Sequence, residues 1–485
     1  MTGPERPSVP RQDHVRRHED TSPTRHFEEM SPIGHYPENE LVEAPPEVVR
    51  RRFPTFTRRQ TNTAMALALA AWTVAVFDYG LFGTLLPAMQ QDFGWSASRA
   101  YLVNTLIAVG TAVVAFGVGP VIDRLGRRRG MMTTIGGTAV ASALTSVIPA
   151  HAGALTTTAV VGVRSLGGLG FSEQSVNATY LNEVFSLTED ERKKKNRGFW
   201  YGIVQGGWPL GFLISSALAL VLLDKIGWRG MYLVAAVPAL VLVVLIGRKL
   251  QESPQFELHQ QMNRLKAQGK AAEAEELAAA YGVEHVTSAP IARIFAPGLR
   301  RNTIVLSLAW IINFFGINIF SVLGSSVLAN AKGVQLSTAF WMLIIINLGA
   351  YFGYIFHGWL GDRIGRKNTI VIGWLISGVA FAVMLAVENT ALIVLTYAIG
   401  LFFLVGPYAA ILFYMGECYP TDCRGTGTVI IGAMSQPGTI IGGFLFTAAA
   451  AAWGTGAAAL WVGALGTCLS GVLMLFAKPV ARLED

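Results

Sequence analysis

The chain has 485 residues, of which 52% are hydrophobic and only 14% are charged, and its formal net charge is +7. Soluble proteins carry about 25% charged residues, so this composition excludes an ordinary soluble enzyme. The hydrophobic residues also come in long blocks, which is typical of a helical bundle in a membrane.

Residues 1–60 are much more polar than the rest of the chain. They hold 10 of the 38 Lys and Arg residues and 10 of the 31 Asp and Glu residues, and they contain no long hydrophobic run. Such a segment cannot bury enough apolar surface to fold by itself, and it lacks the apolar stretch of a signal peptide. We therefore predict a disordered cytoplasmic tail over residues 1–60.

Twelve hydrophobic blocks follow, each close to the 20 or so residues that a transmembrane helix needs. Six lie within residues 61–247 and six within residues 302–477. Residues 248–301 are polar and predict a cytoplasmic linker with one or two surface helices, and residues 478–485 form a short cytoplasmic tail. The sequence thus predicts an all-α membrane protein with twelve transmembrane helices in two six-helix halves.

The positions of Lys and Arg indicate how these helices are oriented. On one side of the predicted bundle the connections contain only Arg99, Lys225, Arg229 and Lys332. Because Lys and Arg are retained in the cytoplasm, we expect both termini there and the protein in the plasma membrane. This asymmetry also explains the positive net charge without nucleic-acid binding.

Two motifs occur twice, in the same order, at equivalent places in the two sets of blocks. The first has the pattern G-x-x-x-D-R-x-G-R-R/K, with Gly119, Asp123, Arg124, Gly126 and Arg127 in one copy and Asp362, Arg363, Gly365 and Arg366 in the other. The second is a glutamate at the end of a block followed by an Arg-Gly pair, with Glu183 and Arg197 in one copy and Glu417 and Arg424 in the other. Such a repeat indicates two structurally related halves.

These motifs resemble those of the major facilitator superfamily of transporters, over nearly all of residues 60–480. The resemblance implies a central cavity between the halves and transport by alternating access. We expect the partners to be a small-molecule substrate, protons and the lipid bilayer, and we expect a monomer. The sequence contains no catalytic nucleophile arrangement, metal cluster or phosphate loop, so we expect no enzyme activity, no cofactor and no metal.

The repeated motifs predict a gate on the cytoplasmic side. Asp123 and Asp362 are placed to meet the positive ends of the fifth and eleventh helices, whereas Glu183 and Glu417 are placed to pair with arginines of the loops. We interpret the two motif pairs as latches that close this gate. Alternatively, the arginines only set the orientation and the glycines only allow tight turns.

Asp78, Arg164 and Glu173 are ionisable residues within predicted helices. Because ionisable residues are costly in a membrane, these three are candidates for a functional role. At 1.5 Å per residue, Asp78 and Arg164 both lie about 15 Å deep. They can pair if the first and fourth helices are neighbours, as the resemblance implies. We hypothesise that Asp78 takes up a proton when an anionic substrate binds Arg164. The alternative is a fixed ion pair. Helical rotation places Glu173 on the face opposite to Arg164. Glu173 then takes part either in proton coupling or in a buried hydrogen bond between helices.

Two groups of residues point to different substrates. Gln205, Asn313 and Asn318, with Glu252-Ser253-Pro254, resemble sugar porters, in which amides bind hydroxyl groups. However, the tenth helix lacks the tryptophan that sugar porters have after Gly406-Pro407.

Other stretches, including Asp78-Tyr79-Gly80 and Gly207-Trp208-Pro209, resemble proton symporters of aromatic and other organic acids. Arg164 can hold a carboxylate with two hydrogen bonds, and Trp208 and Tyr408 offer aromatic surface. We predict uptake of an organic acid, bound by these three residues with Gln205, Asn313 and Asn318. Sugar or polyol symport, proton-driven efflux and a non-transporting receptor are the alternatives.

Overall fold

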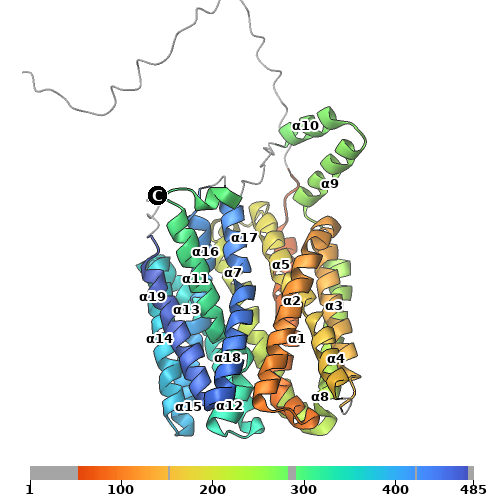
Figure 1. Cartoon of the computed structure of the whole chain (residues 1–485). Coiled ribbons are helices and arrows are strands. Elements are labelled where there is room, and N and C mark those ends of the chain that lie inside the picture. Colours follow the sequence, from red (N-terminus) through yellow and green to blue (C-terminus); the bar gives the residue numbers. More distant parts are fainter. Residues whose placement is uncertain (1–52, 151–152, 282–290, 421–422, 479–485) are drawn as a thin grey trace, which may run out of the picture. The chain divides into compact units, whose positions relative to one another are not determined.

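The computed structural model describes residues 53–150, 153–281, 291–420 and 423–478, except for the side chains of residues 118–123 (Figure 1). Helices make up nearly all of this part of the chain. The helices of the first half are α1 (Arg58–Phe93), α2 (Ala97–Leu125), α3 (Arg127–Ser146), α4 (Ala154–Ser165), α5 (Gly168–Ser186), α6 (Glu191–Lys195), α7 (Arg197–Gln205) and α8 (Gly207–Lys249).

The second half begins with α11 (Arg300–Gly316), which continues into the π-helix η3 (Ile317–Val322). It goes on with α12 (Gly324–Lys332), α13 (Leu336–Ile364), α14 (Arg366–Ala386), α15 (Thr390–Val405), α16 (Tyr408–Glu417), α17 (Arg424–Ala433), α18 (Ser435–Ala458), the π-helix η4 (Ala459–Ala464) and α19 (Leu465–Leu475). Between the halves lie α9 (Pro254–Ala267), α10 (Ala271–Ala280) and the 3-10 helix η2 (Ile291–Phe295).

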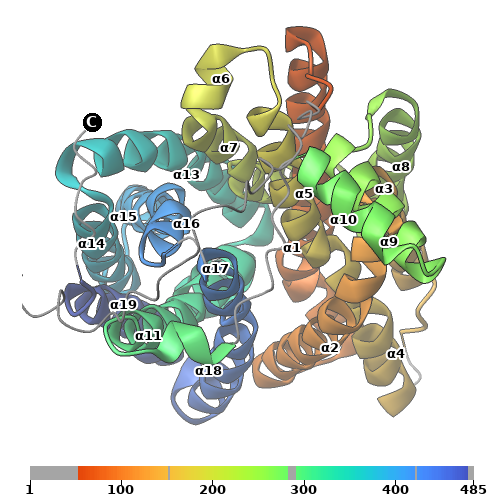
Figure 2. The ribbon, with the colours of Figure 1, turned by 90° about the horizontal axis from the view of Figure 1, so that it is seen from above.

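Eight helical stretches of the described residues are long and apolar enough to span a membrane. Two of them exceed 50 residues, and each contains a glycine with a positive φ that breaks it in two: Gly227 (φ 65°) and Gly454 (φ 83°). With α3 and the broken pair α4–α5, the described helices make twelve crossings, six in each half. The predicted all-α architecture with two six-helix halves is confirmed, and Figure 2 shows the halves side by side.

Several crossings are broken near their middle, and glycine or proline explains the breaks. Gly206 separates α7 from α8, and a Cβ atom at this position would lie 2.7 Å from the ring of Tyr351. Gly406 and Pro407 separate α15 from α16; a Cβ atom on Gly406 would lie 2.2 Å from Nδ1 of His357. Because proline has no amide hydrogen, Pro407 also removes a helical hydrogen bond. These breaks lie beside the central cavity described below.

The linker helices pack on one another and on the first half. Leu258 and Met262 of α9 bury their side chains against the alanines of α10, and Phe53 packs on Tyr281 with ring centroids 4.9 Å apart. Gln255 donates to Ser186 at the end of α5 (3.4 Å). We call the end of the bundle that carries α9 the linker end, and the opposite end the distal end.

Only residues 53–60 of the predicted tail are described, and they are held by the loop after α5. The N–H of Phe56 donates to the carbonyl of Leu187 (2.9 Å), and its own carbonyl accepts from Glu189 (3.0 Å). In the same loop Lys193 donates to Asp190 (2.9 Å), and this hydrogen bond lowers the pKa of the Asp190 carboxyl group. The start of α1 is therefore fixed to the α5–α6 connection.

The two halves are joined at the distal end. Asn104 of α2 donates to Asn318 of η3 (3.2 Å), and Ser325 of α12 donates to the carbonyl of Gly83 in α1 (2.8 Å). A Cβ atom on Gly83 would lie 2.0 Å from the carbonyl oxygen of Val322, so only glycine allows the two backbones to approach this closely. In Figure 2, α2 lies beside α18.

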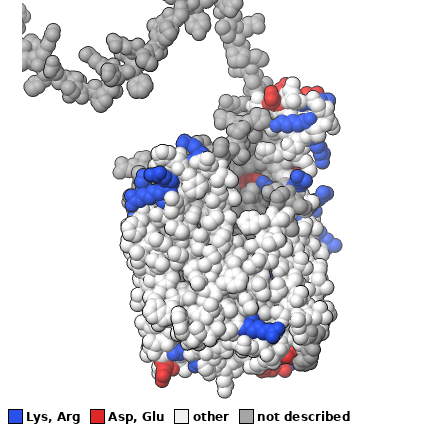
Figure 3. All heavy atoms as spheres, viewed as in Figure 1, with Lys and Arg blue, Asp and Glu red and all other residues white. Residues whose placement is uncertain are grey.

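The outer surface of the bundle is apolar over most of its height. Figure 3 shows a broad band without charges, with Lys and Arg gathered toward the upper edge of this face. Large hydrophobic residues such as Val237, Trp341 and Val379 are more than half exposed. Such a surface is stable against lipid tails, which need no hydrogen bonds.

We expect Gly83→Ala to prevent the distal end from closing, because the added Cβ atom collides with the carbonyl of Val322. A cysteine at Thr105, which is buried between α2 and α18, should then react with a membrane-impermeant maleimide about tenfold faster than in the protein with Gly83. This factor corresponds to a shift of about 1.4 kcal/mol in the equilibrium between the closed and the open distal end. Gly349→Ala is the control, because a Cβ atom there meets open space. Equal labelling of the two variants would contradict this role of Gly83.

Candidate transport site

A cavity of about 630 Å³ lies between the two halves. It extends toward the linker end, where Phe116 of α2 and Val429 of α17 on its wall are 63% and 70% exposed. Nine of its 24 lining residues are aromatic, and they come from both halves: Trp72, Phe116, Phe171, Tyr201, Trp208, Trp310, Phe314, Tyr354 and Tyr408. Of the described residues that line this cavity, none is charged.

A chain of hydrogen bonds forms the polar part of the wall in the first half. Gln174 of α5 donates to the side-chain oxygen of Gln205 (2.9 Å), and the amide nitrogen of Gln205 donates to the hydroxyl of Tyr201 (2.6 Å). All three residues line the cavity. The prediction that Gln205 binds substrate therefore has a suitable geometry, since its amide is at the wall and held by two neighbours.

The wall of the second half is formed by stacked rings with an amide behind them. Tyr408 packs on Trp310 with ring centroids 4.9 Å apart, and its hydroxyl donates to Asn313 (2.9 Å). Asn313 is fully buried and does not line the cavity. Tyr408 thus lies at the surface that a substrate meets, whereas Asn313 positions Tyr408 from behind.

A smaller, nearly enclosed space continues from this cavity toward the distal end. Trp208 and Asn318, both predicted to bind substrate, line it together with Tyr79 and Gln436. The indole nitrogen of Trp208 donates to Ser321 of η3 (3.0 Å), so this side chain connects the two halves. A substrate at this position would contact the residues that hold the distal end closed.

Asp78 and Arg164 form the buried ion pair that the sequence predicts. Nη2 of Arg164 lies 3.1 Å from Oδ2 of Asp78 and 2.9 Å from its backbone carbonyl, and the two residues are 2% and 3% exposed. Ser142 of α3 also donates to Asp78, and the guanidinium stacks over the ring of Tyr232 (5.1 Å). The pair therefore connects α1, α3, α4 and α8 inside the first half.

Arg164 does not line either of the two central spaces in this conformation. Its guanidinium is occupied by Asp78 and Tyr232, and its Nε has no hydrogen-bond partner. Direct binding of a substrate by Arg164 would thus require this side chain to leave Asp78. The structure brings the predicted pair together but places it beside the cavity, so its roles in proton and substrate binding stay predictions.

Glu173 is fully buried and lies away from Asp78. Its Oε1 accepts from Asn177 (3.0 Å), which also donates to the carbonyl of Ala68 in α1 (2.7 Å), and its Oε2 has no partner. The break between α4 and α5 means that Arg164 and Glu173 are not on one regular helix. Their side chains nevertheless have different partners, as the sequence predicts. Its neighbours Ser172 and Gln174 line the cavity, so Glu173 lies just behind the cavity wall.

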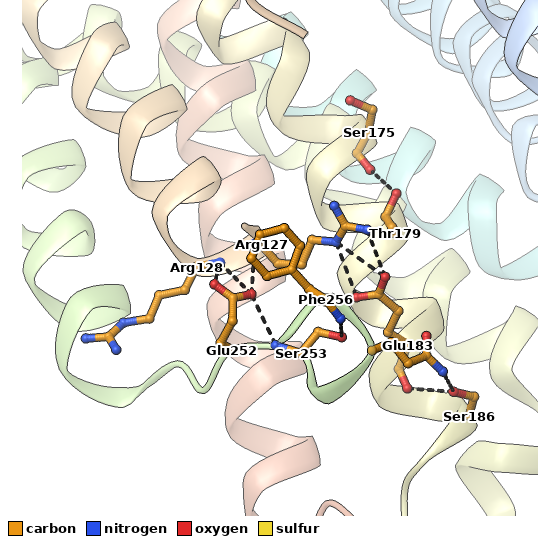
Figure 4. Close-up of polar contacts among 10 residues, drawn as sticks. Arg127, Arg128, Ser175, Thr179, Glu183, Ser186, Glu252, Ser253 and Phe256 are labelled. Carbon is orange, nitrogen blue, oxygen red and sulfur yellow. Dashed lines mark hydrogen bonds and ion pairs between the residues drawn. The ribbon is translucent and has the colours of Figure 1, made fainter. Parts of the chain in front are cut away.

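The first gate motif forms a compact polar cluster at the linker end (Figure 4). Arg127 pairs with Glu183 (2.9 Å) and stacks on Phe256, while its backbone N–H donates to Glu252 (2.8 Å). Gly126 has a φ of 92°, and a Cβ atom on it would lie 2.6 Å from the Glu252 carboxylate. Glycine thus lets the loop turn between Glu252 and Phe256.

The second gate motif repeats the main pair but is more exposed. Arg366 contacts Glu417 directly and Asp362 at 3.9 Å, and Gly365 has a φ of 88°, similar to that of Gly126. The side chain of Glu417 is 41% exposed, against 10% for Glu183. Each arginine–glutamate pair joins elements of one half, so neither pair bridges the halves in this conformation.

The remaining gate arginines are exposed: Arg124, Arg197, Arg363 and Arg424. Arg424 donates weakly to the carbonyl of Tyr419 (3.4 Å), and Arg363 stacks over Trp359 (4.4 Å). Asp362 lines a space of about 370 Å³ with Lys195 and Asn196, so it faces the start of α7 across the halves. The backbone of residues 119–123 belongs to α2, but the side chain of Asp123 and the surroundings of Gly119 lie outside the described parts.

Several residues of the cavity wall were not predicted from the sequence, notably Trp72, Gln174, Trp310, Tyr354 and Gln436. A spacing of four residues could have identified Trp310, since it precedes Phe314 and Asn318 on the same face of a helix. Gln436 is a polar residue in the middle of an apolar block. Trp72 and Tyr354 carry no such signal, because aromatic residues are also common at positions that face lipid.

Comparison with known proteins agrees with this architecture. The family model of the Major Facilitator Superfamily matches residues 67–317 and 306–484. The chain belongs to this superfamily. It is therefore a transport protein and not an enzyme, and it crosses the membrane several times.

Several curated relatives carry aromatic compounds. The chain is 27% identical to the gentisate transporter of Corynebacterium glutamicum, over 77% of this chain and 80% of that protein. It is 26% identical to the gallate transporter of Pseudomonas putida, over 76% and 81%. This member of the superfamily is thus related to transporters of aromatic acids.

Solved structures show the same fold. The xylose transporter of E. coli in a partially occluded inward-open conformation superimposes with a TM-score of 0.67 and 16% identity, covering 88% of this chain and 100% of that chain. At this identity the similarity concerns the fold alone.

We expect Glu183→Gln to lower the midpoint of thermal unfolding in detergent more than Glu417→Gln does. The first change leaves Arg127 without a counter-charge at a largely buried position, at a cost of about 1–2 kcal/mol. The second removes an exposed pair that contributes about 0–1 kcal/mol. Equal shifts would show that the two motifs are energetically equivalent despite their different burial.

Proposed function

We propose that this protein takes up an aromatic acid together with protons across the plasma membrane, by alternating access between the two ends of the bundle. One observation carries this proposal: the cavity wall combines aromatic rings from both halves with a few fixed amide and hydroxyl groups. Aromatic rings pack well on planar aromatic ligands, and the volume is within the usual range of small-molecule sites. The gallate and gentisate transporters among the relatives support this substrate class.

The buried pair of Asp78 and Arg164 supports proton coupling. An ionised carboxylate at this depth is stable only while its partner stays close. When Asp78 takes up a proton, Arg164 loses its main partner and becomes available to a carboxylate of the substrate. The proton and the acid then cross together, since Arg164 can return to Asp78 only after the acid leaves and Asp78 releases its proton.

The orientation follows from the charges at the two ends. The linker end carries both gate motifs and the basic loop Arg192–Lys195, whereas few Lys and Arg residues lie at the distal end. By the positive-inside rule, the linker end faces the cytoplasm. The described conformation would then be open to the cytoplasm, and substrate would enter after the distal contacts of Gly83 and Asn104 separate.

Counterflow in proteoliposomes tests the substrate class. Vesicles loaded with unlabelled compound should exchange labelled 4-hydroxybenzoate, gentisate or gallate, and an inward proton gradient should accelerate their accumulation. Exchange of xylose but of no aromatic acid would replace the proposal with sugar symport. Acceleration by the opposite gradient would indicate efflux, and binding without exchange would indicate a receptor.

Asp78→Asn tests proton coupling separately. The variant should keep counterflow, which needs no net proton movement, but lose at least about tenfold in accumulation driven by a pH gradient, because an amide cannot carry the proton. Ser142→Ala is the matched control, since it removes one hydrogen bond to Asp78 and leaves the carboxylate in place. Gradient-driven accumulation by Asp78→Asn at the rate of the unmodified protein would refute the coupling role.

A further inference from the structure

A basic pocket of about 410 Å³ lies at the linker end of the first half, outside the central cavity. It is formed by the end of α2, the start of α3 and one face of α9. Three arginines line it, Arg128 and Arg129 of α3 and Arg264 of α9, together with the carboxylates of Glu252 and Glu257. We call it the basic pocket.

The positive charge of the basic pocket is only partly neutralised. Glu252 accepts from the backbone N–H groups of Arg127 (2.8 Å), Arg128 (3.3 Å) and Ser253 (3.1 Å), so its charge is used to cap the N-terminus of α3. The guanidinium groups of Arg129 and Arg264 make no hydrogen bond or ion pair with any described residue. Two guanidinium groups are therefore free to bind an anion.

Arg128 is held in a position that faces the pocket. Its guanidinium donates to the carbonyl of Gly247 near the end of α8. In Figure 4 its side chain leaves the start of α3 away from Arg127, which extends toward Glu183. The two consecutive arginines thus serve different sites, one in the gate motif and the other in the basic pocket.

Part of the lining of the basic pocket is apolar. Leu125, Met132 and Phe256 line it, and Met132 packs near Gly247 between α3 and α8. Beyond this point the outward faces of the two helices are apolar and exposed, with Val140 55% and Val244 50% accessible. A ligand with an anionic head and hydrocarbon chains would satisfy both parts of this surface.

The second half has the same repeated motif, but its residues are arranged differently at the position equivalent to the basic pocket. At the start of α14, Lys367 donates to the carbonyls of Leu475 (2.8 Å) and Ala477 (2.6 Å), so its ammonium group is occupied. In the described part of the chain, no helix after α19 takes the place of α9.

We propose that the basic pocket binds the headgroup phosphate of an anionic phospholipid from the leaflet at the linker end, with the acyl chains along α3 and α8. Arginine pairs well with phosphate oxygens, and basic pockets at the cytoplasmic side are suited to anionic headgroups. Because Glu252 and Phe256 form the inner wall and also contact Arg127, the bound headgroup stabilises the gate motif of the first half.

The test measures binding of phosphatidylglycerol to the purified full-length protein, by native mass spectrometry and by titration in detergent. The double variant Arg129→Gln, Arg264→Gln should bind it about 30-fold more weakly, which corresponds to about 1 kcal/mol for each charge removed. Glu257→Gln should bind it about fivefold more tightly, because a carboxylate leaves the pocket. Arg300→Gln, an exposed arginine at the same end of the second half, should not change binding.

Three outcomes would overturn the proposal. Equal affinity for phosphatidylglycerol and phosphatidylcholine would show that the anionic charge is not recognised. Competition by inorganic phosphate at the same concentration as the lipid would indicate a site for a free anion. Unchanged binding in the double variant, with an unchanged unfolding midpoint, would place the lipid elsewhere.

Discussion

In an apolar membrane, each charge and each backbone polar group must find its partner within the protein, and this constraint explains the main features of the first half. Asp78 and Arg164 satisfy each other at a depth where water is scarce, and in doing so they connect four crossings. The same constraint places the breaks of α4–α5 and α7–α8 beside the central cavity, where freed carbonyl and amide groups can meet polar side chains or water. Transport and stability thus depend on the same few polar contacts.

The two halves use the same motif with different surroundings. In both, a glycine with positive φ turns the chain and an arginine of the next helix meets a glutamate from another crossing. Among the described residues, a linker carboxylate, that of Glu252, caps the start of α3 in the first half alone, and there the arginine–glutamate pair is more deeply buried. The carboxylate of the first pair is therefore better shielded from water, with 10% of the Glu183 side chain exposed against 41% for Glu417.

Much of the architecture could be predicted, because long apolar blocks and duplicated motifs are local signals. The pairing of Asp78 with Arg164 followed from their equal depth together with the helix order that the family resemblance implies, and the arginine–glutamate pairs followed from the order of the motifs. The cavity wall could not be predicted in the same way. Asn313 lies behind Tyr408, and Arg164 lies beside the cavity, because the rotation of each helix about its axis depends on packing and on breaks such as Leu166–Gly167. The depth of a residue in a transmembrane helix is therefore easier to predict from sequence than the side of the helix on which its side chain lies.

The packing of the linker helices places the boundary between the two halves after α10. Since α9 and α10 pack on one another, on Phe53 and on the end of α5, the first half extends to Tyr281. The second half begins at Ile294, whose backbone carbonyl accepts a hydrogen bond from the hydroxyl of Thr303 (2.7 Å). If the chain were divided between Tyr281 and Ile291, none of these contacts would be split between the two fragments. Two polypeptides divided there would keep the linker contacts intact and would assemble through the packing of α1, α2, α7 and α8 against α12, α13, α16 and α18.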